Sequence, residues 1–289
     1  MKRSTRKAWA GFTFVLPAVI FVAVFLLLPL IYTFVLSLTK YNFSYDLTPR
    51  FIGIQNYIEV MKDVWFRNAI KNTLIFGLST FPFGVLLPLI IALLIDSLFS
   101  KTLLYEIAIF IPIVVPISLG ALTFLLILDP SYGYINYFLG KFFHLPRFTW
   151  YENGSVALFI MILITHWGLG YQVILFLGGL KTVDVELLDA AEIDGASALQ
   201  RIWYVTLPQL RETTAVATIF ALIRSLKVFV QPMVMTEGGP SHATETIYLY
   251  LYKTAFSLYK MGAASSMAYV LSLIILFVAL INLRIFKVE

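Results

Sequence analysis

Two cations interrupt a long apolar run in the second half of the sequence. Arg224 and Lys227 stand in residues 213–236, which are otherwise uncharged and numerous enough to cross a bilayer. A charge at the centre of a membrane span costs roughly 2.5–3.5 kcal/mol even on insertion scales, so such residues usually face a cavity or a partner. Because they lie three positions apart, they are predicted to share one helix face. Three roles stay open: hydrogen bonding to hydroxyl groups of a substrate, binding an anionic substrate group, or pairing with carboxylates of another subunit.

Several other chemistries are excluded by the residue types. The chain has no Cys and only three His, so thiol catalysis, disulfides, iron–sulfur clusters and Cys-ligated zinc are ruled out, and no metal site is visible. His166 is interpreted as a packed residue and not as a ligand. No Gly-x-x-x-x-Gly-Lys-Ser/Thr loop is present to hold phosphates. The chain is therefore predicted to bind no cofactor of its own.

An acidic segment lies between two of the apolar runs. Residues 178–212 hold six of the sixteen Asp and Glu residues. Asp184 can cap a helix, and Gly195 suits the left-handed residue that follows a helix end. Ser197 can cap a second short helix, and Pro208 marks the entry to the next apolar run. The segment is predicted to be a compact helix–turn–helix.

The apolar residues of this segment favour a protein partner. Leu187, Leu188 and Ala191 fall on one helix face, and together with Trp203 they are unusual in a loop that meets only water. Small Ala residues followed by a Gly turn would allow another protein to approach closely. A solvated acidic loop with no partner is the alternative interpretation.

Membrane spans are the elements that must position all of these residues. Hydrophobic residues make up 60% of the 289 residues and charged residues 13%, against about 45–50% and about 25% in soluble proteins. A spanning helix needs about 20 mainly apolar residues, and barrel strands are too short to give such runs. The sequence predicts an all-α membrane protein, a single transmembrane domain over 1–289. Its six helices are expected at about 10–38, 72–95, 106–128, 155–178, 213–236 and 262–284.

The charges and prolines around these spans add two expectations. Lys2, Arg3, Arg6 and Lys7 precede the first span, and the positive-inside rule therefore favours a cytoplasmic N-terminus. Seven Pro lie within the spans and can be ordinary kinks. The alternative is that residues 112–116, a Pro-Ile-Val-Val-Pro run, bend a gating helix.

The acidic segment also carries a longer pattern. The run Asp189-Ala-Ala-Glu-Ile-Asp194-Gly195, followed by Leu207-Pro208, resembles the EAA loop of binding-protein-dependent ABC importer permeases. In that family the loop lies between spans four and five, as it does here. Residues 51–57 and 235–240 (Phe-Ile-Gly-Ile-Gln-Asn-Tyr and Met-Thr-Glu-Gly-Gly-Pro) resemble the MalF-type subunits of sugar importers in particular. Asp189 stands where the family usually has Glu, which shortens the arm that carries the charge.

The resemblance implies a type I ABC importer permease fold in a bacterial or archaeal cytoplasmic membrane. The EAA coupling loop, at about residues 181–208, would dock on a separate ATPase that uses ATP and Mg. The docking residues would be Asp189, Ala190, Ala191, Glu192, Asp194, Gly195, Leu207 and Pro208. The implied partners are a second, MalG-type permease subunit in a heterodimer, two ATP-binding subunits, an extracytoplasmic solute-binding protein and the lipid bilayer, without nucleic acid.

The resemblance also implies a substrate path midway across the bilayer. Its matching positions are Trp167, Gly168, Tyr171, Ala221, Arg224, Ser225 and Val228, with Lys227 beside them. The Trp and Tyr rings would either stack on sugar faces or pack between helices. The implied substrate is a sugar or oligosaccharide. An anionic polyol or sugar, such as glycerol phosphate or a uronide, is the alternative.

Two other function classes compete with the importer hypothesis. A stand-alone secondary transporter agrees with six spans, but no internal repeat is visible and the EAA loop would stay unexplained. A membrane-embedded enzyme would need clustered His, Asp or Glu within the spans, and the sequence has none. Dependence of uptake on ATP separates the first of these from the importer.

Overall fold

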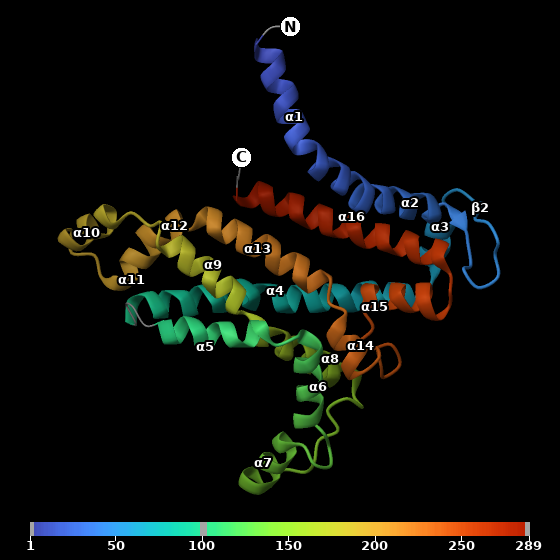
Figure 1. Ribbon diagram of the computed structural model, residues 1–289. Coiled ribbons are helices and arrows are strands. Elements are labelled where there is room, and N and C mark those ends of the chain that lie inside the picture. Colours follow the sequence, from blue (N-terminus) through green and yellow to red (C-terminus); the bar gives the residue numbers. More distant parts are fainter. Residues whose placement is uncertain (1–2, 99–102, 287–289) are drawn as a thin grey trace. The chain divides into compact units, whose positions relative to one another are not determined.

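The computed structural model describes residues 3–98 and 103–286 and is helical almost throughout (Figure 1). This confirms the all-α prediction. The described residues form two compact units. The first consists of the residues up to Asp63 together with Leu251–Leu271, and the second consists of Val64–Tyr250 together with the residues from Ser272 onward. Four helices are long and apolar enough to cross a membrane, and the number rises to six if each of two bent helix pairs is one span.

The first unit begins with a nearly continuous helix. It comprises α1 (Arg3–Val22), a π-helical turn (Ala23–Leu27) and α2 (Leu28–Ser37). Its apolar window is not buried by any described part of the chain, as a lipid-facing span would require. The short strands β1 (Thr39–Lys40) and β2 (Arg50–Phe51) then pair antiparallel. The unit is completed by α3 (Gln55–Lys62), a π-helical turn (Lys253–Ser257) and the start of α16 (Met261–Phe286).

The second unit is built around α4 (Val64–Leu98), a rod of 35 residues. At about 1.5 Å per residue this helix is about 52 Å long, which exceeds the roughly 30 Å hydrocarbon core of a bilayer. Two helices, α9 (Gly170–Leu180) and α13 (Arg211–Leu226), pack against it. The unit also contains α5 (Leu103–Val114), α6 (Ile117–Ile127), α7 (Tyr134–Phe143), α8 (Gly154–Thr165), α14 (Val230–Met235) and α15 (Ile247–Tyr252).

Glycines allow these helices to approach closely. A Cβ at Gly170 would lie 2.2 Å from the carbonyl oxygen of Ile109, and one at Gly179 would lie 2.6 Å from Oγ1 of Thr213. Small residues at such contacts are typical of membrane helices, whose association depends on packing because lipid tails are as apolar as the side chains. Substitution of either glycine would therefore push α9 away from its neighbours.

Three of the predicted spans are not straight. The third bends by 93° between Ile107–Val114 and Ile117–Ile127, at Pro116, which lacks the amide hydrogen that a continuing helix needs. The bend predicted for residues 112–116 is therefore present, whereas its role in gating stays a prediction. The fourth span bends by 45° between Gly154–Gly168 and Gly170–Leu180. The fifth has a break between Leu226, where α13 ends, and Val230, where α14 begins.

Candidate functional site

The acidic segment folds as its local signals predict. Asp184 caps α10 (Val185–Ile193), with its Oδ1 accepting the amide of Glu186 at 2.9 Å. Gly195 has φ +80, the left-handed conformation that glycine adopts without strain. Ser197 forms a capping box with Gln200 on α11 (Ala198–Arg201). A π-helical turn (Ile202–Thr206) then leads into α12 (Leu207–Gln209), which has Pro208 in its first turn.

Most of the predicted docking residues in this segment lie at the surface. Asp189, Ala190, Glu192, Asp194, Gly195 and Pro208 are exposed, and Ala191 and Leu207 are half-buried. Leu187 and Trp203, whose types suggested burial, are 52% and 61% exposed, and Ile193 is 86% exposed. Leu188 instead attaches the segment to the core that contains Val183 and Leu210. The segment thus presents apolar surface that only another molecule could cover.

The acidic side chains of the segment differ in whether they form an ion pair within the chain. Glu192 forms an ion pair with Arg201, which joins α10 to α11. Within residues 3–98 and 103–286, no ion pair involves Asp189. Asp189 is therefore available to a partner, as is the exposed Asp194, whereas Glu192 would first have to leave Arg201.

A cavity of about 290 Å³ lies among α5, α6, α8, α9, α13 and α14. This volume is near the lower end of ordinary ligand pockets. Its polar and aromatic lining consists of Thr165, Trp167, Gly168, Tyr171, Arg224 and Gln231. Trp167 and Tyr171 are 54% and 50% exposed, and their rings make T-shaped contacts with Phe124 and Phe220. Four of the predicted path residues therefore meet at one cavity.

Arg224 is fixed at the wall of this cavity by Gly168. Its Nη1 donates a hydrogen bond of 2.9 Å to the carbonyl oxygen of Gly168. A Cβ at position 168 would lie 2.9 Å from Nη2 of Arg224, so the glycine provides the space for the guanidinium. No carboxylate of the described chain pairs with Arg224. Its charge is thus available to a ligand or to another chain.

The other predicted path residues lie elsewhere. Lys227 directly follows the end of α13 at Leu226, its amide still donates to the carbonyl oxygen of Ile223 at 3.1 Å, and its side chain is exposed and does not line the cavity. Ala221 and Ser225 line a much smaller space beside Arg224. Val228 is buried in a hydrophobic cluster with Phe76. These three are wall residues behind the cavity and do not form its surface.

Sequence analysis missed Gln231 and Thr165. Gln231 is 3% exposed, and its Nε2 lies 3.5 Å from Oγ1 of Thr165. A lone amide within the apolar run of residues 228–235 was the signal that could have identified Gln231. His166, by contrast, is packed as predicted: its ring lies against the carbonyl oxygens of Ile162 (2.7 Å) and Thr80 (3.4 Å).

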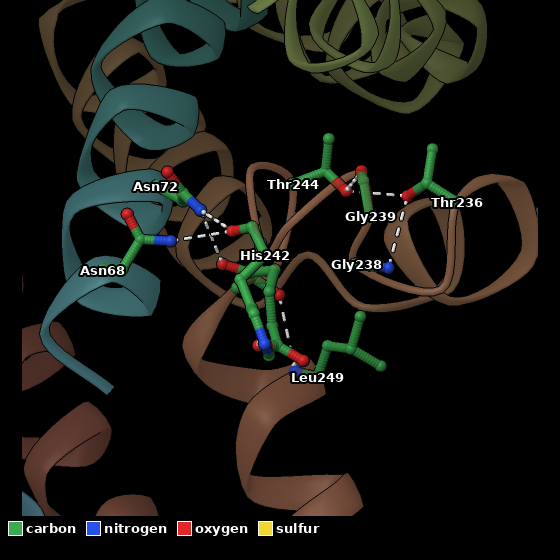
Figure 2. Close-up of polar contacts among 10 residues, drawn as sticks. Asn68, Asn72, Thr236, Gly238, Gly239, His242, Thr244 and Leu249 are labelled. Atoms are coloured by element: carbon green, nitrogen blue, oxygen red, sulfur yellow. Dashed lines mark hydrogen bonds and ion pairs between the residues drawn. The ribbon is translucent and has the colours of Figure 1, made fainter. Parts of the chain in front are cut away.

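The connection between α14 and α15, residues 236–246, is held by a dense polar network (Figure 2). Asn72 Nδ2 donates to the carbonyl oxygens of His242 (2.9 Å) and Glu245 (3.0 Å), and Asn68 Nδ2 donates to His242 at 2.7 Å. The Glu245 carboxylate, which is fully buried, contacts Nδ1 of His242. The ring of Trp65 stacks on His242 at 4.0 Å. This 236–246 loop is thereby attached to the first three turns of α4.

The same loop reaches the break in the fifth span. Thr246, the last residue of the loop, donates its hydroxyl to the carbonyl oxygen of Val228 at 2.9 Å. Pro232, four residues after Val228, has no amide hydrogen for this carbonyl, and a buried carbonyl without a partner is costly. Thr246 therefore stabilises the conformation that places Arg224 before the break and Gln231 after it.

The three features lie at different depths along α4. Asn72 contacts the 236–246 loop, whereas Ala92 belongs to the core beneath the acidic segment. The 20 helical residues between them correspond to about 30 Å, the thickness of a bilayer hydrocarbon core. Thr80 and Gly84, midway between these points, line the small space beside Arg224. The cavity is thus at mid-depth between two loops at opposite ends of the unit.

The chain is similar to several known proteins. The family model described as "Binding-protein-dependent transport system inner membrane component" matches residues 51–287. A probable ABC transporter permease protein of Bacillus subtilis, YurN, is 31% identical over 96% of this chain and 95% of its own length. The sulfoquinovosyl glycerol transport system permease protein SmoG of Agrobacterium fabrum is 30% identical over 94% of this chain and 89% of its own length. A solved chain of a bacterial ABC transporter for import of the acidic polysaccharide alginate has a TM-score of 0.85 at 23% identity, covering 99% of this chain and 97% of that one.

Proposed function

Because the chain belongs to the family of binding-protein-dependent transport system inner membrane components, we propose that it is the permease subunit of an ATP-driven importer for a sugar or oligosaccharide. The observation that carries this proposal is the cavity at mid-depth, lined by Trp167, Tyr171 and Arg224. Aromatic faces suit the apolar faces of sugar rings, and a guanidinium presents several donors to oxygen atoms. The relative SmoG is named for a glycoside, which agrees with this substrate class.

An anionic saccharide is the second candidate substrate. It is favoured by the guanidinium of Arg224, which meets no carboxylate within the described residues. A half-buried cation without a counter-ion is costly, and an anionic ligand would neutralise it on arrival. A neutral sugar would leave that charge uncompensated, whereas a carboxylate on a second permease subunit would compensate it without touching substrate.

In this proposal ATP is hydrolysed on separate subunits. The exposed surface around Asp189, Ala190 and Gly195 would insert into a cleft of an ATP-binding subunit, and ATP with Mg would bind only there. Two such subunits would close on ATP and move the two permease halves as rigid bodies between inward-open and outward-open states. A second, MalG-type permease subunit would complete the path in a bacterial or archaeal cytoplasmic membrane. A solute-binding protein would deliver the substrate on the outer side, near Gly238, Gly239 and Pro240.

The test is uptake into proteoliposomes that contain this chain with the subunits encoded beside it. Arg224→Gln and Trp167→Ala are compared with Lys227→Gln, which removes a cation of the same span that lies away from the cavity. ATP-dependent uptake should fall at least about tenfold, equivalent to about 1.4 kcal/mol, for both cavity variants and stay normal for Lys227→Gln. If Arg224→Gln impairs an anionic substrate and spares its neutral analogue, the substrate is anionic. Uptake by this chain alone without ATP would contradict the importer.

A further inference from the structure

The segment between α6 and α8, residues 130–151, displays aromatic side chains that no described part of the chain covers. On α7, Tyr134 is 77% exposed, Tyr137 63%, Phe138 51%, Phe142 60% and Phe143 62%. Figure 1 shows α7 at the far end of α6, away from α4. So many uncovered rings would be unfavourable in water, which indicates that the segment meets an apolar environment.

The segment is nonetheless a defined structure. Asn136, 5% exposed, donates to the carbonyl oxygen of Phe148 at 2.9 Å and accepts its amide at 3.1 Å. The turn before α7 is closed by Asp129, whose Oδ1 accepts the amides of Ser131 and Tyr132, and these bonds lower the pKa of its carboxyl. A fixed scaffold therefore holds the exposed rings in place.

The side chains of α7 are sorted by chemistry. Phe138 and Phe142, four residues apart, pack with ring centroids 4.7 Å apart and form a purely apolar strip. Tyr137 and Lys141 form a neighbouring strip with polar tips, where the ammonium lies 3.2 Å from the phenol oxygen. Arg147 is the only other Lys or Arg of residues 130–151, which contain no Asp or Glu. Apolar rings beside tyrosines and cations are typical of helices that lie in a membrane interface.

Two further polar groups lack a partner at the end of this segment. The indole Nε1 of Trp150 and the phenol oxygen of Tyr151 are buried atoms without a hydrogen bond. Burial also raises the pKa of Tyr151, so its hydroxyl stays a donor. Both atoms are enclosed by the described chain, so they do not reach lipid headgroups and do not bear on what covers α7.

We propose that residues 130–151 are an anchor in the outer interface of the lipid bilayer. The Phe strip enters the acyl region, and Lys141 and Arg147 lie beside lipid phosphates. Lipid is favoured over a protein cover because the segment holds cations with no acids and because polar tips border the rings on α7. The anchor would also hold the end of α6, which the 93° bend directs away from α5.

The absence of Cys makes the test direct. Phe142→Cys is labelled with a nitroxide in the assembled complex in bilayers, and its collision rates with oxygen and with an aqueous nickel chelate are measured. Leu47→Cys, at a loop residue that is 99% exposed, provides the aqueous reference. The unsubstituted chain in the same labelled complex gives the background from partner cysteines.

An anchor predicts that oxygen collisions exceed nickel collisions at position 142 and that the ratio reverses at position 47. Nickel collisions that dominate at position 142 would place α7 in water and overturn the proposal. Low rates for both reagents would mean that another subunit covers the face, which also overturns it. Neither result bears on ATP-dependent uptake, so failure of the anchor would be distinguishable from failure of the importer.

Discussion

The acidic segment of residues 178–212 and the 236–246 loop differ in whether their polar groups are exposed or buried. Thr244 and Glu245 in the second are completely buried, and their backbone and side chains are engaged within the chain. In the first, Asp189 and Asp194 are exposed, and the one ion pair links Glu192 to Arg201. The 236–246 loop is thus part of the fold, whereas the acidic segment is a surface that a partner would complete.

This difference separates two kinds of mutational effect. Leaving a buried polar group without its partner costs about 1–3 kcal/mol, whereas an exposed ion pair contributes about 0–1 kcal/mol. Substitutions in the 236–246 network should therefore change stability. Substitutions in the acidic segment should change transport while the chain stays folded.

The largest effect is expected from Asn72→Ala. It removes the donor to the buried carbonyl oxygen of Glu245 and one of the two donors to that of His242, and it should lower stability by about 1–3 kcal/mol. Thermal unfolding of the purified chain in detergent measures this change. Asn68→Ala is the matched control, since Asn68 is less buried and donates one bond to His242, and it should cost about half as much. Equal unfolding temperatures for Asn72→Ala and the unsubstituted chain would show that the network is not structural.

Gly195→Arg should have the next largest effect, chiefly on transport. The bulky cation would occupy the proposed docking surface, so uptake should fall at least about tenfold, or about 1.4 kcal/mol, with ATP hydrolysis uncoupled from it. Gly195→Ala is the control: it shares the strain of φ +80, yet its Cβ would meet nothing within 4 Å. Normal uptake by Gly195→Arg would count against the coupling assignment.

Thr246→Val tests the link from the outer loop to the cavity. The substitution keeps the shape of the side chain but removes the donor to the Val228 carbonyl oxygen, which should lower stability by about 1 kcal/mol. The KM for uptake should also change, because this hydrogen bond no longer stabilises the helix break that positions Gln231. Thr246→Ser retains the hydroxyl and should restore the original KM. If both variants change KM equally, the hydrogen bond is not what positions the break.

Glu192→Gln should have only a small effect on stability. It weakens an exposed ion pair and should lower the stability of the chain by less than about 1 kcal/mol, as measured by the same thermal unfolding. Asp189→Asn, which removes an exposed carboxylate with no ion pair in the described chain, should leave stability unchanged and reduce uptake. An uptake loss confined to Glu192→Gln would instead identify Glu192 as the docking carboxylate.

The same comparison explains what the sequence could predict. The acidic segment follows local signals, since Asp184, Gly195 and Ser197 each act within a few residues of their own position. The 236–246 network depends on the hydrogen bond from Asn72 to Glu245, which is 173 positions away. No local sequence pattern predicts a contact over that distance. Pro232 indicates a kink near Val228, but nothing in residues 213–236 indicates that α13 ends at Leu226 or that Thr246 bonds the free carbonyl oxygen.

The contact between Gly168 and Arg224 also constrains how this protein could have evolved. The two positions are 56 residues apart, yet the first side-chain atom at position 168 would lie 2.9 Å from Nη2 of Arg224, so the guanidinium would have to shift. In a lineage, a larger residue at position 168 would therefore disturb this arginine, whereas loss of the arginine would free position 168 to vary. Among descendants of this chain, a larger residue at position 168 should therefore appear together with a different residue at position 224. If Arg224 binds an anionic substrate, a change in the charge of the substrate would then be accompanied by substitutions at both positions.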